Sequence, residues 1–193
     1  MLTVVAGIAD AVDYTTMGGV FAANMTGNTV LAGIALARRH YADTWHHVAP
    51  LLAFFLGAML SRLLLRLLRT PTASLLVEAA LIAGVGFLDI GPFPAVLIVA
   101  FPMGIQASAV TQFAGSAVST VVVTSTLART ADGALDRLCP GAKTSPPAIA
   151  NTRLLALTWA GYLGGAVVGA LLLGVLPCRL LMPAALLLLV IFL

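Results

Sequence analysis

Charged side chains are scarce in this chain of 193 residues: lysine, arginine, aspartate and glutamate together make up 9% of it. Soluble domains carry about 25% charged residues, so this composition excludes an ordinary soluble domain. The formal net charge is only +3, and no basic run is interleaved with aromatic residues. The sequence therefore predicts no nucleic-acid surface.

Catalytic and metal-binding motifs are also missing. The two cysteines, Cys139 and Cys178, form no CxxC pair, so neither a zinc ligand set nor a redox pair is predicted. The sequence contains no Ser/His/Asp array, Walker loop or dinucleotide fingerprint. The three histidines cluster in 38–47, a predicted loop whose aromatic residues favour a membrane-interface belt over a metal site. We therefore expect no enzyme activity, metal or cofactor.

Apolar residues dominate instead, at 61% of the chain with a mean hydropathy of +1.07. This composition predicts an all-α polytopic membrane protein, because a span needs about 20 apolar residues. Six apolar segments are predicted, at 2–37, 48–68, 75–93, 94–130, 153–176 and 179–193. The first and fourth would form helices of about 54 Å, far longer than the roughly 30 Å hydrocarbon core. Both must break, bend or re-enter.

An internal repeat runs through the chain. GIADAVDYTTMGG (7–19) matches GIQASAVTQFAGS (104–116) at an offset of 97 residues, and FLGAMLS (55–61) matches YLGGAVV (162–168) at 107. Two further matches keep the same order, which favours duplication over chance. Each half then holds one broken segment followed by two spans.

The repeat predicts two units, 1–93 and 94–193, each with three membrane elements. With an odd number of elements per unit, the second unit starts from the opposite side of the membrane and the repeat is inverted. Placing the N-terminus inside puts seven of the ten lysines and arginines at cytoplasmic ends. An N-in, C-in topology is therefore predicted.

The stretch GGVFAANMTGNTV interrupts the first apolar segment. Gly18 and Gly19 are expected to end one half-helix, and a second is expected to start near Asn28, with Asn24 and Thr26 as further N-cap candidates. Broken backbone within a membrane must face protein or a wet cavity, and a half-helix N-terminus suits an anion or polar group. A packing kink is the alternative, although it explains the glycines better than the polar residues.

Asp10 and Asp13 lie three residues apart on one predicted helix face, which Tyr14 continues. Carboxylates within a span are costly to insert, so the pair should be interior, paired or protonated. This predicts a proton-carrying or cation-contacting group, above all at Asp10. A position near the membrane surface is the alternative.

Polar residues of the second half complete the predicted substrate or ion site, although serine and threonine can also bond to their own helix carbonyls. The predicted site comprises Asp10, Asn24, Thr26, Asn28, Gln106, Thr124 and Thr126, with Asp13, Tyr14 and Ser108 as secondary members. Glu78 aligns with Pro183 in the repeat, so it is expected instead in a salt bridge near the interface, with Arg69 as the candidate partner.

Gly161, Gly165 and Gly169 recur every four residues in the span 153–176. Such stripes let two helix backbones approach closely in lipid, which predicts a homodimer through this span. The same stripe could instead hold another helix of the same chain.

The segment GIADAVDYTTMGGVFAANMTGNTVLAG, with PMGIQASAV and VVVTSTLAR further on, resembles the bacterial YoaK-like membrane family over nearly the whole chain. The resemblance implies six spans in the bacterial inner membrane and supplies no substrate. Members of the family tend to read G-x-Q-N-A and V-T-G-T-L in the second half. Here Ala107 follows Gln106 and Ser125 follows Thr124, and Asp13 stands where an uncharged residue is usual.

These features together predict a transporter of a small polar solute or ion, bound near the midplane where the two broken segments cross. Proton coupling is an option for such a site. A channel is the nearest alternative, and a non-transporting membrane scaffold or sensor is a further one. A polar cavity would favour transport, whereas a dry, filled core would favour the scaffold.

Overall fold

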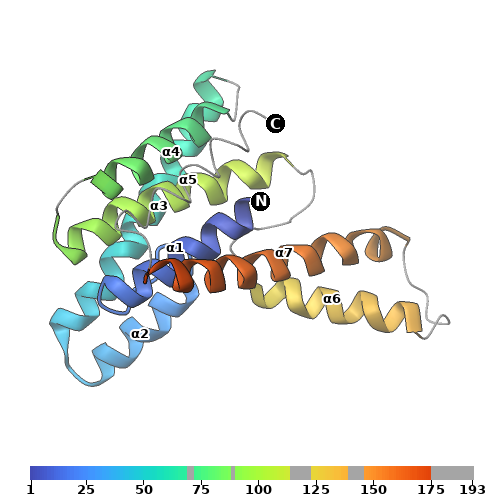
Figure 1. The fold of residues 1–193 in the computed structure, drawn as a ribbon, viewed down its shortest axis with the longest axis horizontal. Helices are drawn as coiled ribbons and strands as arrows, with labels where there is room; N and C mark the ends of the chain where they lie inside the picture. The colour runs from blue at the N-terminus through green and yellow to red at the C-terminus, as the bar shows by residue number, and fades with distance from the viewer. Residues whose placement is uncertain (69–71, 88–89, 114–122, 139–145, 175–193) are drawn as a thin grey trace.

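The computed structural model describes residues 1–68, 72–87, 90–113, 123–138 and 146–174, and these residues are helical with short connections (Figure 1). The helices are α1 (Leu2–Thr16), α2 (Met25–Ala37), α3 (Tyr41–Leu68), α4 (Thr72–Phe87), α5 (Pro92–Phe113), α6 (Val123–Leu138) and α7 (Pro146–Leu172). The predicted all-α class is confirmed for this part of the chain. The span predicted at 179–193 lies outside the described residues.

Three of the described helices are long and apolar enough to cross a membrane: Tyr41–Leu67, Pro92–Ala109 and Arg153–Leu172. Helix α2 is apolar but shorter. Large apolar side chains point outward from two of these spans, with Phe55 of α3 exposed by 61% and Leu171 of α7 by 70%. Outward-facing apolar residues of this kind fit a lipid environment.

The predicted loop at 38–47 is largely helical, so this prediction was wrong, and most of the polar stretch between the predicted segments 94–130 and 153–176 is helical as well. Helix α3 begins at Tyr41, so most of the segment 38–47 forms its first turns. Helices α6 and α7 extend into the polar stretch 131–152, leaving only residues 139–145 between them. Hydropathy separates apolar segments from polar ones, whereas α6 segregates apolar and polar residues onto opposite faces of one helix.

The break predicted in the first apolar segment is confirmed. Helix α1 ends at Thr16, and Gly18 and Gly19 follow with φ angles of 80° and 75°, which glycine adopts readily because it lacks a Cβ atom. Helix α2 then begins at Met25, three residues before the predicted start. The first apolar segment therefore consists of two half-helices joined by an irregular stretch.

The helices of the two halves are interleaved. Helix α1 packs along α7 and α3 packs along α5, while α2 packs on α3, α6 on α7 and α4 on α5. In Figure 1, α3, α4 and α5 lie together on one side of the molecule, and α6 and α7 extend as a pair toward the other. The first helix of each half therefore packs against a later helix of the other half.

Glycines form two close helix crossings among the described helices. A Cβ atom added to Gly7 of α1 would collide with the backbone carbonyl oxygen of Tyr162 in α7. One added to Gly104 of α5 would collide with the carbonyl oxygen of Phe54 in α3, and Gly57 faces the backbone of α5 in the same way. Neither crossing has room for a side chain, so the helix backbones are in direct contact.

The stripe of Gly161, Gly165 and Gly169 lies against α1 of the same chain. Cβ atoms added at these positions would meet Thr3, Val4 and Ile8, respectively. The homodimer through this stripe stays a prediction, but the stripe already holds a helix within the chain. This arrangement favours the alternative of an internal contact.

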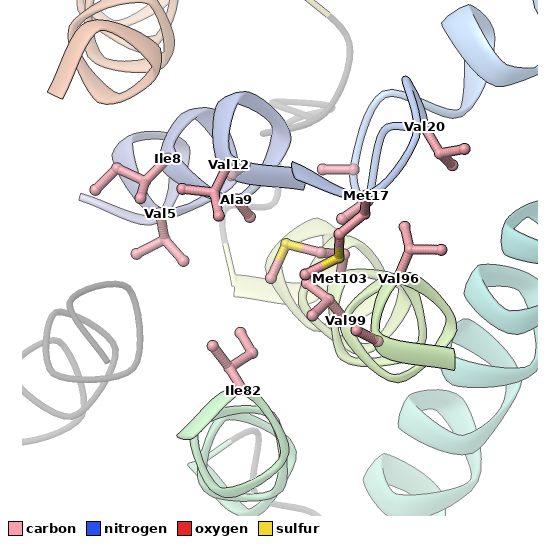
Figure 2. Packing of buried hydrophobic residues seen from close by; sticks show 14 of the residues in the cluster. Val5, Ile8, Ala9, Val12, Met17, Val20, Ile82, Val96, Val99 and Met103 are labelled. Atoms are coloured by element: carbon pink, nitrogen blue, oxygen red, sulfur yellow. The ribbon is translucent and has the colours of Figure 1, made fainter. Parts of the chain in front are cut away.

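A cluster of buried apolar residues joins α1, the break, α4 and α5 (Figure 2). In this view Ile82 of α4 points toward α1 and α5, while Met103 of α5 lies beneath α1 near Met17. The labelled members are Val5, Ile8, Ala9, Val12, Met17, Val20, Ile82, Val96, Val99 and Met103. The break is thus anchored on the core by its own apolar residues as well as by polar contacts.

Candidate functional site

Asp10 holds the break in place. Its Oδ1 atom accepts hydrogen bonds from the backbone N–H groups of Ala23, at 2.6 Å, and Asn24, at 3.1 Å. Its Oδ2 atom accepts a hydrogen bond of 2.5 Å from the hydroxyl group of Tyr162 in α7. The Asp10 side chain is only 3% exposed. Through these hydrogen bonds, one buried carboxylate connects α1, the break and α7.

The backbone of the break forms an oxyanion site. Two consecutive N–H groups, those of Ala23 and Asn24, converge on one oxygen just before the N-terminus of α2. Such an arrangement suits a carboxylate or another anion, because N–H donors and the helix dipole both favour negative charge. In the described conformation Asp10 occupies this site.

Asn28 closes the break from its other side. Its side-chain amide bonds both backbone groups of Phe21: the Phe21 N–H donates to Oδ1 at 3.0 Å, and Nδ2 donates to the Phe21 carbonyl at 2.7 Å. The side chain of Asn24 accepts a hydrogen bond from the Gly27 N–H at 3.1 Å, which makes Asn24 the N-cap of α2. Both asparagines therefore satisfy backbone groups that the break leaves without helix partners.

Asn28→Ala is expected to lower the free energy of unfolding by about 2 kcal/mol, because it leaves the N–H and carbonyl groups of Phe21 unpaired in a part-buried position. The matched control is Thr29→Ala, since the exposed Thr29 hydroxyl bonds only to the Met25 carbonyl of its own helix. Thermal unfolding in detergent measures both variants. Equal stability of the two would contradict the assigned role of Asn28.

The structure brings together three of the predicted first-half site residues, Asp10, Asn24 and Asn28. All three are engaged with the backbone of the break rather than with open space. Thr26 is exposed on the first turn of α2, and Tyr14 is 48% exposed at the end of α1. These three residues therefore lie together and stabilise the break in this conformation, and their role in binding a solute stays a prediction.

Among the predicted second-half residues, Gln106 does not join this cluster. Gln106 is buried, and its Nε2 atom donates to the Leu2 carbonyl at 3.0 Å, at the opposite end of α1 from the break. Ser108 is half-buried on α5. Thr124 and Thr126 lie in the first turn of α6, and their side chains lie outside the described residues. The substrate or ion site as a whole stays a prediction.

Two residues next to Asp10 and the break could not be predicted as their neighbours from the sequence. Tyr162, the partner of Asp10, was noted only as part of the repeat. His46, predicted to lie in an interfacial loop, is on α3, where its ring stacks on Phe93 with a centroid distance of 5.0 Å. A Cβ added to Gly18 would lie 2.8 Å from His46 Nε2. A tyrosine next to a glycine stripe was the one signal that could have indicated a close interhelical partner.

Two further carboxylates are buried away from the break's hydrogen bonds. Asp13 and Glu78 are both 0% exposed, and their oxygens have no hydrogen-bond partner among the residues that the structure describes. This carboxylate lies inside the protein, and its predicted position near the membrane interface stays a prediction. Arg69, its predicted partner, lies outside the described residues.

Comparison with known proteins identifies the family. Residues 1–193 match the family described as "Protein of unknown function (DUF1275)". The chain is also 28% identical over 182 residues to the UPF0700 transmembrane protein YoaK of Bacillus subtilis (strain 168), covering 89% of this chain and 80% of that protein. No solved structure matches the chain. The resemblance to the YoaK-like family is confirmed, and because the match extends over the whole chain, this membrane protein belongs to the DUF1275 family.

Proposed function

We propose that this protein transports a small polar solute or ion across the bacterial inner membrane, with both termini in the cytoplasm. The observation that carries the proposal is the break between α1 and α2, which a buried carboxylate ties to a helix of the other half. Irregular backbone within a membrane is typical of transporter sites, where freed backbone groups bind solute or ions. Asp10 joins this break to α7, which belongs to the half of the chain that is proposed to move relative to the first half during transport.

The two glycine crossings support an inverted repeat, which is a common architecture of transporters. In each crossing, the glycine of the first helix faces a carbonyl oxygen and an amide nitrogen four residues later. These atoms are Tyr162 O and Ala166 N opposite Gly7, and Phe54 O and Ala58 N opposite Gly104. Gly7 and Gly104 are 97 residues apart, and the backbone atoms that they face are 108 residues apart in the chain. The second separation differs by one residue from the 107 expected from the sequence.

The packing of the remaining helices follows the same relation. Helix α2 packs on α3 as α6 packs on α7, and the pair α1 and α7 corresponds to the pair α5 and α3. Two equivalent units that exchange their first helices can rock about a shared axis, which is how many inverted-repeat transporters alternate access. The interleaved packing therefore supports a transporter more than a protein of two independent halves.

The solute site is proposed at the break. The residues proposed to line it are Asp10, Asn24, Thr26 and Asn28 from the first half and Thr124 and Thr126 from the second, whereas Gln106, which bonds to Leu2 at the other end of α1, does not line it in the described conformation. In the described conformation Asp10 fills the oxyanion site formed by the Ala23 and Asn24 N–H groups. Binding of an anionic or carbonyl-bearing solute there would require these donors to exchange one acceptor for another. Polar solutes with an oxygen acceptor are therefore the first candidates.

A non-transporting scaffold is the second candidate function. The observation that favours it is the cluster of buried apolar residues between α1, α4 and α5, which fills the region beside the break (Figure 2). In a scaffold, the break would serve only to let the helices of the two halves pack closely.

A solute of the transporter is expected to raise the melting temperature of the purified protein, because a ligand that binds only the folded state stabilises it. The measurement is a thermal-shift screen of small polar metabolites and ions, followed by uptake of each hit into proteoliposomes. Asp10→Asn should abolish pH-dependent uptake of that solute. Asp43→Asn is the control, since Asp43 is exposed and forms only a surface pair with His40. Two results would contradict the role of Asp10: wild-type uptake that does not depend on pH, or pH-dependent uptake that persists in Asp10→Asn.

A further inference from the structure

Two carboxylates in the interior have no partner for their charge among the residues that the structure describes. Asp13 on α1 and Glu78 on α4 are each 0% exposed, and among the described residues none donates a hydrogen bond to any of their four oxygens. Asp10, one turn from Asp13, is also buried but accepts three hydrogen bonds. All three carboxylates are buried, but among the described residues only Asp10 has hydrogen-bond donors.

The surroundings of Asp13 supply no cation among the described helices. Asp13 lies one turn after Ala9, on the side of α1 that forms the apolar cluster of Figure 2. Helix α5, which packs on α1, contains no titratable side chain over Pro92–Phe113. Helix α7 contributes Tyr162, whose hydroxyl is bonded to Asp10, and Arg153, which is exposed. Asp10 on the same helix is also an acid and supplies no positive charge.

The surroundings of Glu78 are similar. It lies one turn before Ile82, and both are fully buried on the face of α4 that meets α5. Helix α3 also contacts α4, but Arg62 and Arg66 near its C-terminal end are exposed, and its other titratable residues lie within 41–47 at its opposite end. No described basic side chain is placed to neutralise this carboxylate.

A proton satisfies these sites better than a metal ion does. An ionised carboxylate without a partner is strongly disfavoured in an apolar interior, whereas the neutral acid is tolerated. Sodium, magnesium or calcium would need several oxygen ligands around one point. Asp13 and Glu78 are on different helices, and among the described residues no group of three acidic, histidine or cysteine side chains could hold a metal.

We propose that Asp13 and Glu78 are proton-binding sites of the membrane interior, each holding one proton in the described conformation. Movement of α1 or α4 admits water to the site. The carboxylic acid then releases its proton to water and becomes a carboxylate, and it binds a proton again when the site closes. The coupling of these protons to solute movement rests on the proposed transporter function. The binding of the protons does not, because it is argued from burial and from the lack of a donor among the described residues.

Labelling with the apolar reagent dicyclohexylcarbodiimide tests the proposal without any solute. The reagent adds to a protonated carboxyl group in an apolar environment: its central carbon bonds the carboxyl oxygen, and the acid proton moves to a carbodiimide nitrogen. The adduct rearranges to a stable N-acylurea that peptide mass spectrometry locates. Full-length wild-type protein in lipid nanodiscs should be labelled at both Asp13 and Glu78. Labelling should fall as the pH rises, because the ionised form does not react.

Several controls belong to the same experiment. Asp13→Asn should lose the label at position 13 and keep it at Glu78, and Glu78→Gln should do the reverse. Asp43, whose side chain is 66% exposed, should react only with a water-soluble carbodiimide. Absence of label at both interior positions would overturn the proposal, as would protection by sodium chloride but not by choline chloride at constant pH. Labelling at both positions would sustain it even if no solute is ever found to be transported.

Discussion

Gly104→Ala is expected to lower the free energy of unfolding by about 3 kcal/mol or more, one of the largest effects available from a single methyl group in this protein. The new Cβ would collide with the carbonyl oxygen of Phe54 and lie 3.0 Å from the amide nitrogen of Ala58. Both are backbone atoms of α3, so relief requires the two helices to separate. Thermal unfolding and size-exclusion chromatography in detergent would measure the loss.

Gly33→Ala is the matched control, because Gly33 is also helical and a Cβ atom there would meet nothing within 4 Å. It should raise stability by about 0.5 to 1 kcal/mol, since alanine favours the helix over glycine. Gly7→Ala should match Gly104→Ala, because Gly7 faces the equivalent atoms of α7. If Gly104→Ala is as stable as Gly33→Ala, the close crossing of α3 and α5 does not exist.

Asp10→Ala is expected to destabilise the protein by about 3 kcal/mol or more. It removes the acceptor of two backbone N–H groups, those of Ala23 and Asn24, and of the Tyr162 hydroxyl, and a buried donor left without a partner costs about 1 to 3 kcal/mol. Thermal unfolding measures the loss. Limited proteolysis at the break should accelerate at the same time, since the segment loses its attachment to α1 and α7.

Graded variants separate the parts of this contact. Asp10→Asn keeps one acceptor oxygen and should be intermediate, while Tyr162→Phe removes one bond of the three and should have the smallest effect. Asp43→Ala on the exposed end of α3 should leave stability within about 0.5 kcal/mol of the wild type. Should Asp10→Ala behave like Asp43→Ala, the break is not held by this carboxylate.

The break and its carboxylate could be predicted from the sequence because both violate local rules. A segment too long to span the membrane must be interrupted, and Gly18 and Gly19 mark the place where helical backbone ends. Asp10 was singled out because a carboxylate in an apolar segment is costly. Its partner, Tyr162, could not be predicted in the same way, because 152 residues separate the two and helix periodicity does not say which helices meet.

The glycine stripe illustrates a related limit. Its spacing predicted a close helix partner, and α1 occupies that position. The same spacing serves a helix of another copy equally well, so sequence alone left the two alternatives open. The burial of Glu78 could not be predicted for a different reason: hydropathy along a segment does not say which side of a helix a neighbour covers, and packing of α4 on α5 encloses this carboxylate.

Packing between the first and last described helices also constrains how the chain is made. The hydroxyl group that Asp10 binds belongs to a residue synthesised 152 residues later, which at about 5 to 20 residues per second is a delay of roughly 8 to 30 seconds. During that time the ribosome has not yet produced the surface that covers α1. In nascent chains arrested before Tyr162, we expect α1 to be cleaved by proteases or to form crosslinks with the insertion machinery. Release of the N-terminal half into lipid then waits for synthesis of the C-terminal half.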